Sequence, residues 1–380
     1  MLEIAVVGGG ICGLALARRL SERGLDYGLF EARSRLGGRV LSRLCPVSAI
    51  NVDLGPTWFW PETEPFMALL VGELGLKTLP QTDDGTLMVL AEPDKPVRKL
   101  DNQLIHAGAM RLAGGMGALI DSLLGSIPED RLHLEHVLTE IADHGDHVEL
   151  TFRTGEQSVS IAAKRAVLAM PPRLVEEFVS FEPNLDQALF EAMRATPTAM
   201  ATEAKAVITY DEMPGFQEAC GSGNAFVHHD QAVLREIFDA SVGGQAALGG
   251  FLALPPDLRK AFRDGLPMLI ASQFAQIFGA GFEHGELQIQ DWATERFTCA
   301  SQDRREFAAQ GFPLSSRLLQ ERLWDGRLLF AGSETAETGA GHLEGALDEA
   351  LRVEAHLVRE APTAVASLDA SPPAATVKLN

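Results

Sequence analysis

Short branched apolar runs, typical of buried strands, and longer apolar stripes at helical spacing follow one another along the chain. Residues 2–7 form a branched run that predicts a buried parallel strand, and glycines follow it directly. Residues 11–20 keep an apolar stripe at helical spacing, and Gly24 ends it. A second strand is predicted over residues 27–30. The start of the chain therefore predicts a strand, a turn, a helix and a second strand.

The predicted turn contains Gly8, Gly10 and Gly13, which have the spacing G-x-G-x-x-G. Gly8 permits a tight turn, Gly10 lets the backbone approach a pyrophosphate, and Gly13 lets the helix lie close to the sheet. The helix start then directs unpaired N–H groups at phosphates. Glu31 ends the second strand, where a carboxylate accepts hydrogen bonds from ribose hydroxyls. Glycine-rich turns also occur as simple connectors. The prediction of a dinucleotide site therefore depends on the strand before the turn, the helix after it and the acidic residue Glu31.

Along the rest of the chain, short buried strands give way to longer helical patterns and then resume. Short buried strands, predicted over residues 131–138, 148–152 and 166–170, continue the first type. A turn at residues 143–146 predicts a hairpin between residues 137–141 and 148–152. Residues 173–290 instead contain longer helical patterns, with strands around residues 204–210 and 247–252. A strand at residues 326–331 and a helix from residue 341 to about 359 resume the first type. This alternation favours two units in a chain of 380 residues.

Composition and charge narrow the classes of partner. Acidic residues number 52 against 32 basic ones, which argues against nucleic acid or an anionic membrane as a partner. The sequence contains no apolar run of about 18 residues to cross a membrane. Its four cysteines are scattered, and its histidines lack ligand spacing, so no metal site or disulfide framework is expected. Since the first strand begins at residue 2, no signal peptide is expected, and a cytoplasmic location is predicted.

Two loops suit a large ligand. The loop after the second strand contains Gly37, Gly38 and Arg39, which suit a second close approach to phosphate; a surface turn with solvated arginines is an equal alternative. A later glycine- and proline-rich loop, residues 51–61, contains two of the four tryptophans. Aromatic residues in such loops fill a core edge or cradle a planar ligand.

Several motifs together resemble the flavin-containing amine oxidase superfamily, which includes monoamine oxidases, polyamine oxidases and L-amino-acid oxidases. The resemblance covers most of residues 1–358, and its motifs stand in the family's order. They are residues 8–13 with Glu31, Gly37-Gly38-Arg39, Asp53-x-Gly55-x-x-Trp58, Ala169-Met170-Pro171-Pro172, and residues 330–334 followed by Gly341-x-x-Glu344-Gly345-Ala346. A bound FAD, rather than NAD, is implied.

The resemblance implies an α/β fold: a Rossmann-like FAD-binding domain of the GR2 type with an inserted α+β substrate domain. The FAD-binding domain is expected over residues 1–62, 109–172 and 291–358. The substrate domain is expected over residues 63–108 and 173–290. A flexible tail is expected over residues 361–380, which are rich in alanine, proline and serine.

The resemblance also implies the residues that hold FAD. Gly8, Gly10 and Gly13 are expected at the pyrophosphate, Glu31 at the adenosine ribose, and the Val137 backbone at the adenine. The helix start after Gly341 is expected to direct its positive end at the flavin pyrimidine, where reduction places negative charge. The remaining expected contacts are Arg33, Gly38, Arg39, Gly55, Pro56, Thr57, Trp58, Gly332, Ser333, Glu334 and Leu343.

Three residues are candidates for the chemistry. Lys205 interrupts an otherwise buried strand, where an unpaired ammonium group is costly. In the family a matching lysine bonds a water beside flavin N5 and assists the reaction with oxygen; a solvated strand face is the alternative. Trp292 matches a tryptophan near the flavin, with ordinary core as the alternative. His342 would bond a polar substrate or act as a base, or support the site from outside.

Two departures from the family pattern bear on the flavin link and the substrate. Ser301 stands where monoamine oxidases attach the flavin through cysteine, with Cys299 two residues away, so FAD is expected without a covalent link. Gln302 and His342 stand where two tyrosines flank the substrate amine in those enzymes. The absent tyrosine pair argues against simple aromatic monoamines.

The implied function is an FAD-dependent oxidase of amines or amino acids. The substrate α-carbon would deliver a hydride to flavin N5, giving an imine, and O2 would reoxidise the flavin and form H2O2. Two alternatives stay open: a flavin-dependent desaturase or dehydrogenase acting on a carbon–carbon bond, and a non-catalytic FAD-binding redox sensor. The sequence leaves open which amine is the substrate and whether the chain forms an oligomer.

Overall fold

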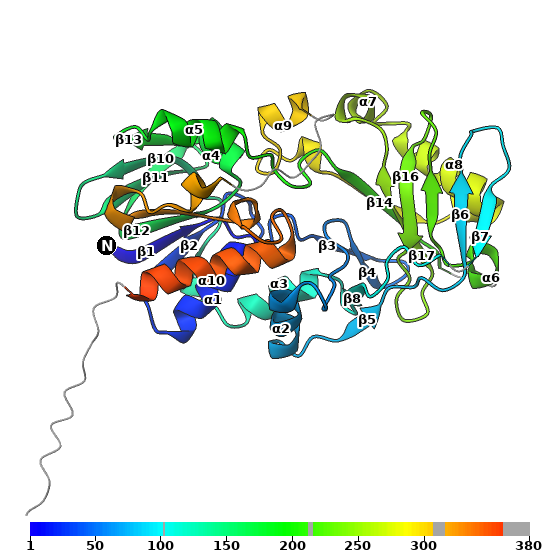
Figure 1. Ribbon diagram of the computed structural model, residues 1–380, viewed down its shortest axis with the longest axis horizontal. Helices are drawn as coiled ribbons and strands as arrows, with labels where there is room; N and C mark the ends of the chain where they lie inside the picture. Colours follow the sequence, from blue (N-terminus) through cyan, green and yellow to red (C-terminus); the bar gives the residue numbers. More distant parts are fainter. Residues whose placement is uncertain (102, 212–215, 307–315, 360–380) are drawn as a thin grey trace, which may run out of the picture.

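A computed structural model describes residues 1–101, 103–211, 216–306 and 316–359. Two large sheets stand apart in it, joined by shorter strands and loops (Figure 1). The tail predicted over residues 361–380 lies outside the described residues. Of the helices in the described ranges, none combines the length and apolar character of a membrane span.

The first sheet is built around the predicted N-terminal unit. β1 (Leu2–Val7) lies between β2 (Tyr27–Phe30) and β12 (Gln157–Ala169), and all three run parallel. The strand order is β13-β10-β11-β12-β1-β2-β9, and β19 also pairs with β12 in parallel. The other strands are β9 (Leu132–His133), β10 (Val137–Asp143), β11 (Val148–Thr154), β13 (Ser180–Glu182) and β19 (Leu328–Ala331). The predicted hairpin is present as the antiparallel pair β10 and β11.

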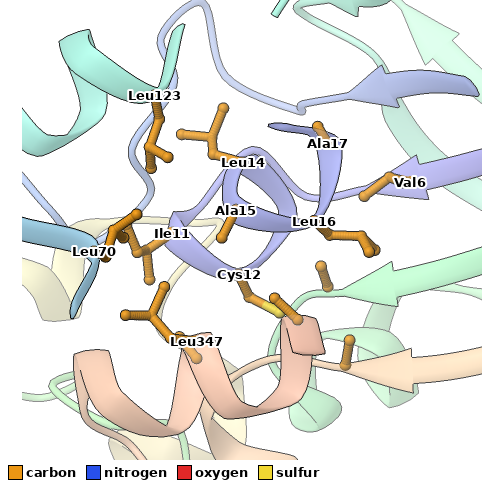
Figure 2. Packing of buried hydrophobic residues seen from close by; sticks show 14 of the residues in the cluster. Val6, Ile11, Cys12, Leu14, Ala15, Leu16, Ala17, Leu70, Leu123 and Leu347 are labelled. Carbon is orange, nitrogen blue, oxygen red and sulfur yellow. The ribbon is translucent and has the colours of Figure 1, made fainter. Parts of the chain in front are cut away.

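Helices cover one face of the parallel strands. They are α1 (Ile11–Glu22), α2 (Pro65–Glu73), α3 (Gly117–Leu124) and α10 (Leu343–Arg359). Figure 2 shows Leu70, Leu123 and Leu347 from the three later helices gathered around α1. Because this packing buries residues 11–17 and Leu20 of α1, the start of the helix is held firmly against the sheet.

The second sheet has the order β18-β14-β17-β16-β15-β6-β7 and is antiparallel except for β15 and β6. Its strands are β6 (Thr86–Leu90), β7 (Arg98–Asp101), β14 (Ala204–Thr209), β15 (Ala225–Val227), β16 (Leu234–Asp239), β17 (Ala247–Leu252) and β18 (Glu286–Asp291). Ile270 and Phe274 of α8 (Leu266–Phe278) pack into its core. The short helices nearby are α6 (Phe216–Cys220) and α7 (Pro256–Ala261).

Shorter strands lie between the two sheets (Figure 1). β3 (Ser42–Cys45) pairs with β4 (Ile50–Asp53), and β5 (Thr78–Pro80) pairs with β8 (Met110–Leu112). β4 leads directly into the tryptophan-containing loop. These strands therefore place that loop between the two large sheets.

Two segments expected in the second unit pack on the first. α4 (Pro172–Phe178), β13 and α5 (Gln187–Arg194) follow the boundary expected at residue 173, yet β13 pairs with β10. Val175 and Met193 of the two helices join the core beneath β10 and β11. Met67 of α2 likewise packs in the core around α1. Both segments have apolar faces that complete the first core. The hydrophobic pattern along the chain predicts such a face, but it does not show against which sheet the face packs.

Candidate functional site

A cavity of about 360 Å³ opens at the carboxyl ends of the parallel strands. Val7, Phe30, Ala169 and Gly332, at or just beyond the ends of β1, β2, β12 and β19, all line it. In open α/β sheets, ligands bind in the crevice outside these strand ends. The cavity continues to the tryptophan loop and to Phe251 in the second sheet. It is therefore placed to hold a ligand that reaches from one sheet to the other.

The three motif glycines have different packing. Gly8 has φ +112°, and a Cβ there would lie 2.3 Å from the Ala169 carbonyl oxygen. A Cβ at Gly13 would lie 1.9 Å from the Gly8 carbonyl oxygen, so this glycine permits close contact between helix and turn and does not line the cavity. Around Gly10, which lines the cavity, an added Cβ meets nothing within 4 Å. Only Gly10 thus leaves open space where a ligand can approach the backbone.

Glu31 and Arg33 line the cavity beside this turn. The Glu31 carboxylate is buried and accepts hydrogen bonds from the N–H groups of Gly9 (2.7 Å) and Arg33 (2.9 Å). Arg33 donates from Nη2 to Thr298 Oγ1 (2.7 Å), and its guanidinium lies 5.6 Å from the Phe297 ring centre. Its buried Nε makes no hydrogen bond but lies 3.5 Å from Oε2 of Glu295, with which it forms an ion pair. These contacts hold the Arg33 side chain at the cavity wall.

Arg39 and Glu334 form an ion pair across the cavity wall. Nη1 of Arg39 contacts Oε1 of Glu334, and Nη2 donates to Oε2 at 3.1 Å. The arginine also donates to Ser333 Oγ (3.2 Å) and to the Ala199 carbonyl (2.9 Å). Burial opposes ionisation of the Glu334 carboxyl, but the Arg39 guanidinium outweighs it and lowers the pKa. The pair fixes both side chains beside the Gly332 turn.

Lys205 is a buried residue of β14 and is 1% exposed. Its Nζ donates to the Gly55 carbonyl (3.0 Å) and contacts Thr57 Oγ1. Three aromatic rings face the same nitrogen, those of Trp58, Phe238 and Phe251, at 5.9, 5.0 and 5.4 Å. Burial lowers the lysine pKa to about 7. The alternative of a solvated strand face is therefore wrong.

The lysine meets the cavity indirectly. Lys205 does not line it, whereas its partners Gly55 and Thr57 do. Trp292 also lies outside the lining: it is fully buried, and its Nε1 donates to the Leu54 carbonyl at 3.0 Å. Both side chains thus hold the loop that forms the cavity wall.

The remaining predicted site residues divide in two. Gly38, Pro56, Trp58, Val137, His342 and Leu343 line the cavity. Ser301 and Gln302 instead line a polar surface recess with Arg173, where Ser301 Oγ donates to Glu177 at 2.8 Å. Gln302, at the place of one family tyrosine, therefore does not line the cavity, because the bond from Ser301 to Glu177 holds this segment against α4.

Several lining residues were not predicted as site residues. They include Trp60, Glu64, Met200, Phe251, Phe297 and Thr298. Trp60 lies in the same loop as the predicted residue Trp58, and its position there could have identified it as a site residue. Phe251 pairs in register with Lys205, so finding it requires the pairing of β14 with β17. Within the described residues, no cluster of three or more histidine, cysteine or acidic side chains is arranged to hold a metal.

The glycine turn, the strand-end cavity and the acidic residue after β2 define a dinucleotide-binding α/β protein. Residues 95–355 match the family described as "Flavin containing amine oxidoreductase", and residues 6–72 match "NAD(P)-binding Rossmann-like domain". The chain therefore belongs to the flavin-containing amine oxidoreductase family. The resemblance, the α/β fold with a Rossmann-like domain and the flavin cofactor are confirmed.

Curated relatives match parts of the chain. Putrescine oxidase of Kocuria rosea is 33% identical over 127 residues, covering 33% of this chain and 26% of that protein. Flavin-containing amine oxidase A of Equus caballus is 24% identical over 247 residues, covering 63% of this chain and 44% of that one. The first curated relatives are thus matched over less than two thirds of their length.

Solved structures match nearly the whole chain. Wild-type putrescine oxidase bound to putrescine has a TM-score of 0.74 at 17% identity, covering 94% of this chain and 99% of the other. Cyclohexylamine oxidase from Brevibacterium oxydans IH-35A has a TM-score of 0.75 at 16% identity with the same coverage. At these identities the likeness establishes the fold.

Proposed function

We propose that this protein is an FAD-dependent oxidase of amines or amino acids that uses O2 and forms H2O2. One observation carries the proposal: a buried lysine amine contacts Gly55 and Thr57, which line a cavity that begins at the dinucleotide turn. Family membership and the named relatives support an amine as the reducing substrate. The net charge of −20 also suits a cationic substrate.

The cavity residues fit FAD. Gly8 and Gly10 with the start of α1 would hold the pyrophosphate, because these residues line the cavity and the first N–H groups of a helix lack intrahelical partners. Glu31 would accept from the adenosine ribose, with Arg33 beside the phosphates and the Val137 backbone at the adenine. Gly38 and Arg39 would also lie beside the phosphates, and Gly332, Ser333 and Glu334 would meet the ribityl and pyrophosphate end. The other predicted residues that line the cavity are Gly55, Pro56, Thr57, Trp58 and Leu343.

The bound flavin would supply the redox chemistry, accepting a hydride equivalent from the substrate α-carbon and returning electrons to O2. The protein's part is to orient the amine and to exclude water. Trp58, Trp60 and Phe251 supply an apolar wall for that purpose. His342 would bond a polar substrate group at the same cavity. Lys205, through the wall formed by Gly55 and Thr57, would hold a positive charge near the site of oxygen reduction.

Anaerobic mixing of the purified yellow protein with amines and amino acids tests the proposal. We expect at least one amine to bleach the flavin absorbance, and we expect air to restore it with one H2O2 formed per flavin. A matched series in which each amine is replaced by the corresponding alcohol controls for non-specific reduction. Bleaching by no amine would reject the proposal. Bleaching without peroxide on admission of air would favour the dehydrogenase alternative.

Acid denaturation is expected to release all of the FAD into solution, because Cys12 is the one cysteine that lines the described cavity and its buried thiol is poorly reactive. Cys12 lines the cavity within the glycine turn, and burial raises its pKa well above the ordinary range. Burial likewise raises the pKa of Cys299 to about 12, and this residue does not line the cavity. The absorbance of the supernatant and the pellet measures the distribution. Yellow colour that stays with the precipitated protein would contradict noncovalent binding.

A further inference from the structure

A second, much smaller cavity lies behind Thr57. Its volume is about 20 Å³, and its polar lining includes Asp53, Thr57 and Arg111, with Val207 and Phe238 as apolar neighbours. Thr57 lines both this cavity and the large one, and its hydroxyl is the one that Lys205 contacts. The small cavity therefore lies one side chain away from the lysine.

One residue that lines the small cavity, Arg111, has a donor without a hydrogen-bond partner. The Arg111 side chain is buried, and its Nη2 donates to the Ser241 carbonyl at 2.8 Å, but its Nε has no hydrogen-bond partner. The Oδ1 atom of Asp53 accepts hydrogen bonds from Ser42 Oγ and from the Met116 N–H. A buried donor without a partner is costly, and a polar cavity of this size holds one water molecule.

We propose that one water molecule fills this cavity and joins Arg111, Asp53 and Thr57 into a hydrogen-bonded chain ending at Lys205. Asp53 and Arg111 are then positioning residues that set the protonation of Lys205 from behind the wall. The inference rests on the proposed function for its consequence, since the charge on Lys205 would assist oxygen reduction. The chain itself rests on the geometry of the small cavity.

The proton transfer along this chain is balanced. The Lys205 ammonium gives a proton to Thr57 Oγ1 as Thr57 gives its own proton to the water. The water gives a proton to the Asp53 carboxylate in turn, so an ammonium and a carboxylate become a neutral amine and a neutral acid. Burial raises the pKa of Asp53, which brings the two groups closer in proton affinity.

The charged groups around Lys205 change its pKa in opposite directions. Burial lowers the lysine pKa; Asp53 of β4 and Glu236 of β16 raise it, and Arg111 of β8 lowers it further. Asp239 faces Arg111. On β18, the residue paired with Lys205 is the uncharged Gln290. Removing the Asp53 charge should therefore lower the Lys205 pKa, and removing the Arg111 charge should raise it.

The test compares Asp53→Asn and Arg111→Gln with the wild-type holoprotein. Each protein is reduced with dithionite, mixed with air across a pH series, and followed by the return of flavin absorbance. We expect the pH midpoint of the reoxidation rate to fall by about one unit in Asp53→Asn and to rise by about one unit in Arg111→Gln. Asparagine keeps an oxygen for the Ser42 and Met116 bonds, so a merely structural role of Asp53 would not move the midpoint.

Asp146→Asn, the same change at an exposed hairpin position, is the matched control and should leave the midpoint unchanged. Because dithionite replaces the amine, failure of the oxidase proposal does not remove this readout. Urea unfolding between pH 7 and 9 gives a second readout that needs no reaction with oxygen. The pH at which the unfolding free energy begins to rise should shift in the same directions. Midpoints and unfolding curves identical to wild type in both variants would overturn the proposal.

Discussion

Replacing Gly13 with alanine is expected to abolish FAD binding and to destabilise the folded chain. The new Cβ would lie 1.9 Å from the Gly8 carbonyl oxygen, which forces the helix away from the turn. The surrounding side chains of α1 are buried against α2, α3 and α10, so the helix has little room to move (Figure 2). Overpacking of this kind costs about 3 kcal/mol or more. Urea unfolding of the apoprotein and fluorescence titration with FAD measure the two effects.

Gly10→Ala is the matched comparison, and it should separate binding from folding. Its Cβ meets no protein atom within 4 Å, so the apoprotein should unfold within about 1 kcal/mol of wild type. The methyl group would instead occupy the open side of the turn, and the Kd for FAD should rise at least about tenfold. Unchanged FAD affinity in Gly10→Ala, or unchanged stability in Gly13→Ala, would contradict the two roles.

These glycines also explain why the nucleotide end could be predicted from sequence. The strand, turn and helix are contiguous in sequence, and the reason for each glycine lies in this short segment. The hairpin β10 and β11 was predictable for the same reason, because a short turn fixes its register. The structure adds the difference between Gly10, which faces open space, and Gly13, which faces backbone.

The reacting end of the cavity depends on contacts that no local pattern contains. Lys205 meets Thr57, which lies 148 positions earlier, and Phe251 becomes its neighbour only when β14 pairs with β17. Trp292 is directed at Leu54, 238 positions earlier. Residues of α4 and α5 likewise pack against β10 and β11, which come earlier in the chain. Pairing between distant strands sets all of these, and periodicity along the chain does not encode it.

Lys205→Met is expected to slow reoxidation of the flavin by O2 about a hundredfold while changing flavin reduction by the amine much less. The methionine has a similar length and no charge, so it fills the space among Trp58, Phe238 and Phe251 but stabilises no negative charge developing on oxygen. Stopped-flow measurements of the two half-reactions, first without oxygen and then with it, separate the effects. Equal slowing of both would reject the assigned role.

The same variant should remove a pH dependence of stability. Because the Lys205 pKa is lowered from 10.5 to about 7, the unfolded chain binds a proton that the folded chain lacks between these values. The unfolding free energy of the wild type should therefore rise with pH through this window, by roughly 2 kcal/mol between pH 7 and 9. Lys205→Met lacks the titrating group, so the rise should be absent. A parallel slope in both proteins would place the ionisation on another residue, and the lysine at the cavity wall would then stay charged throughout.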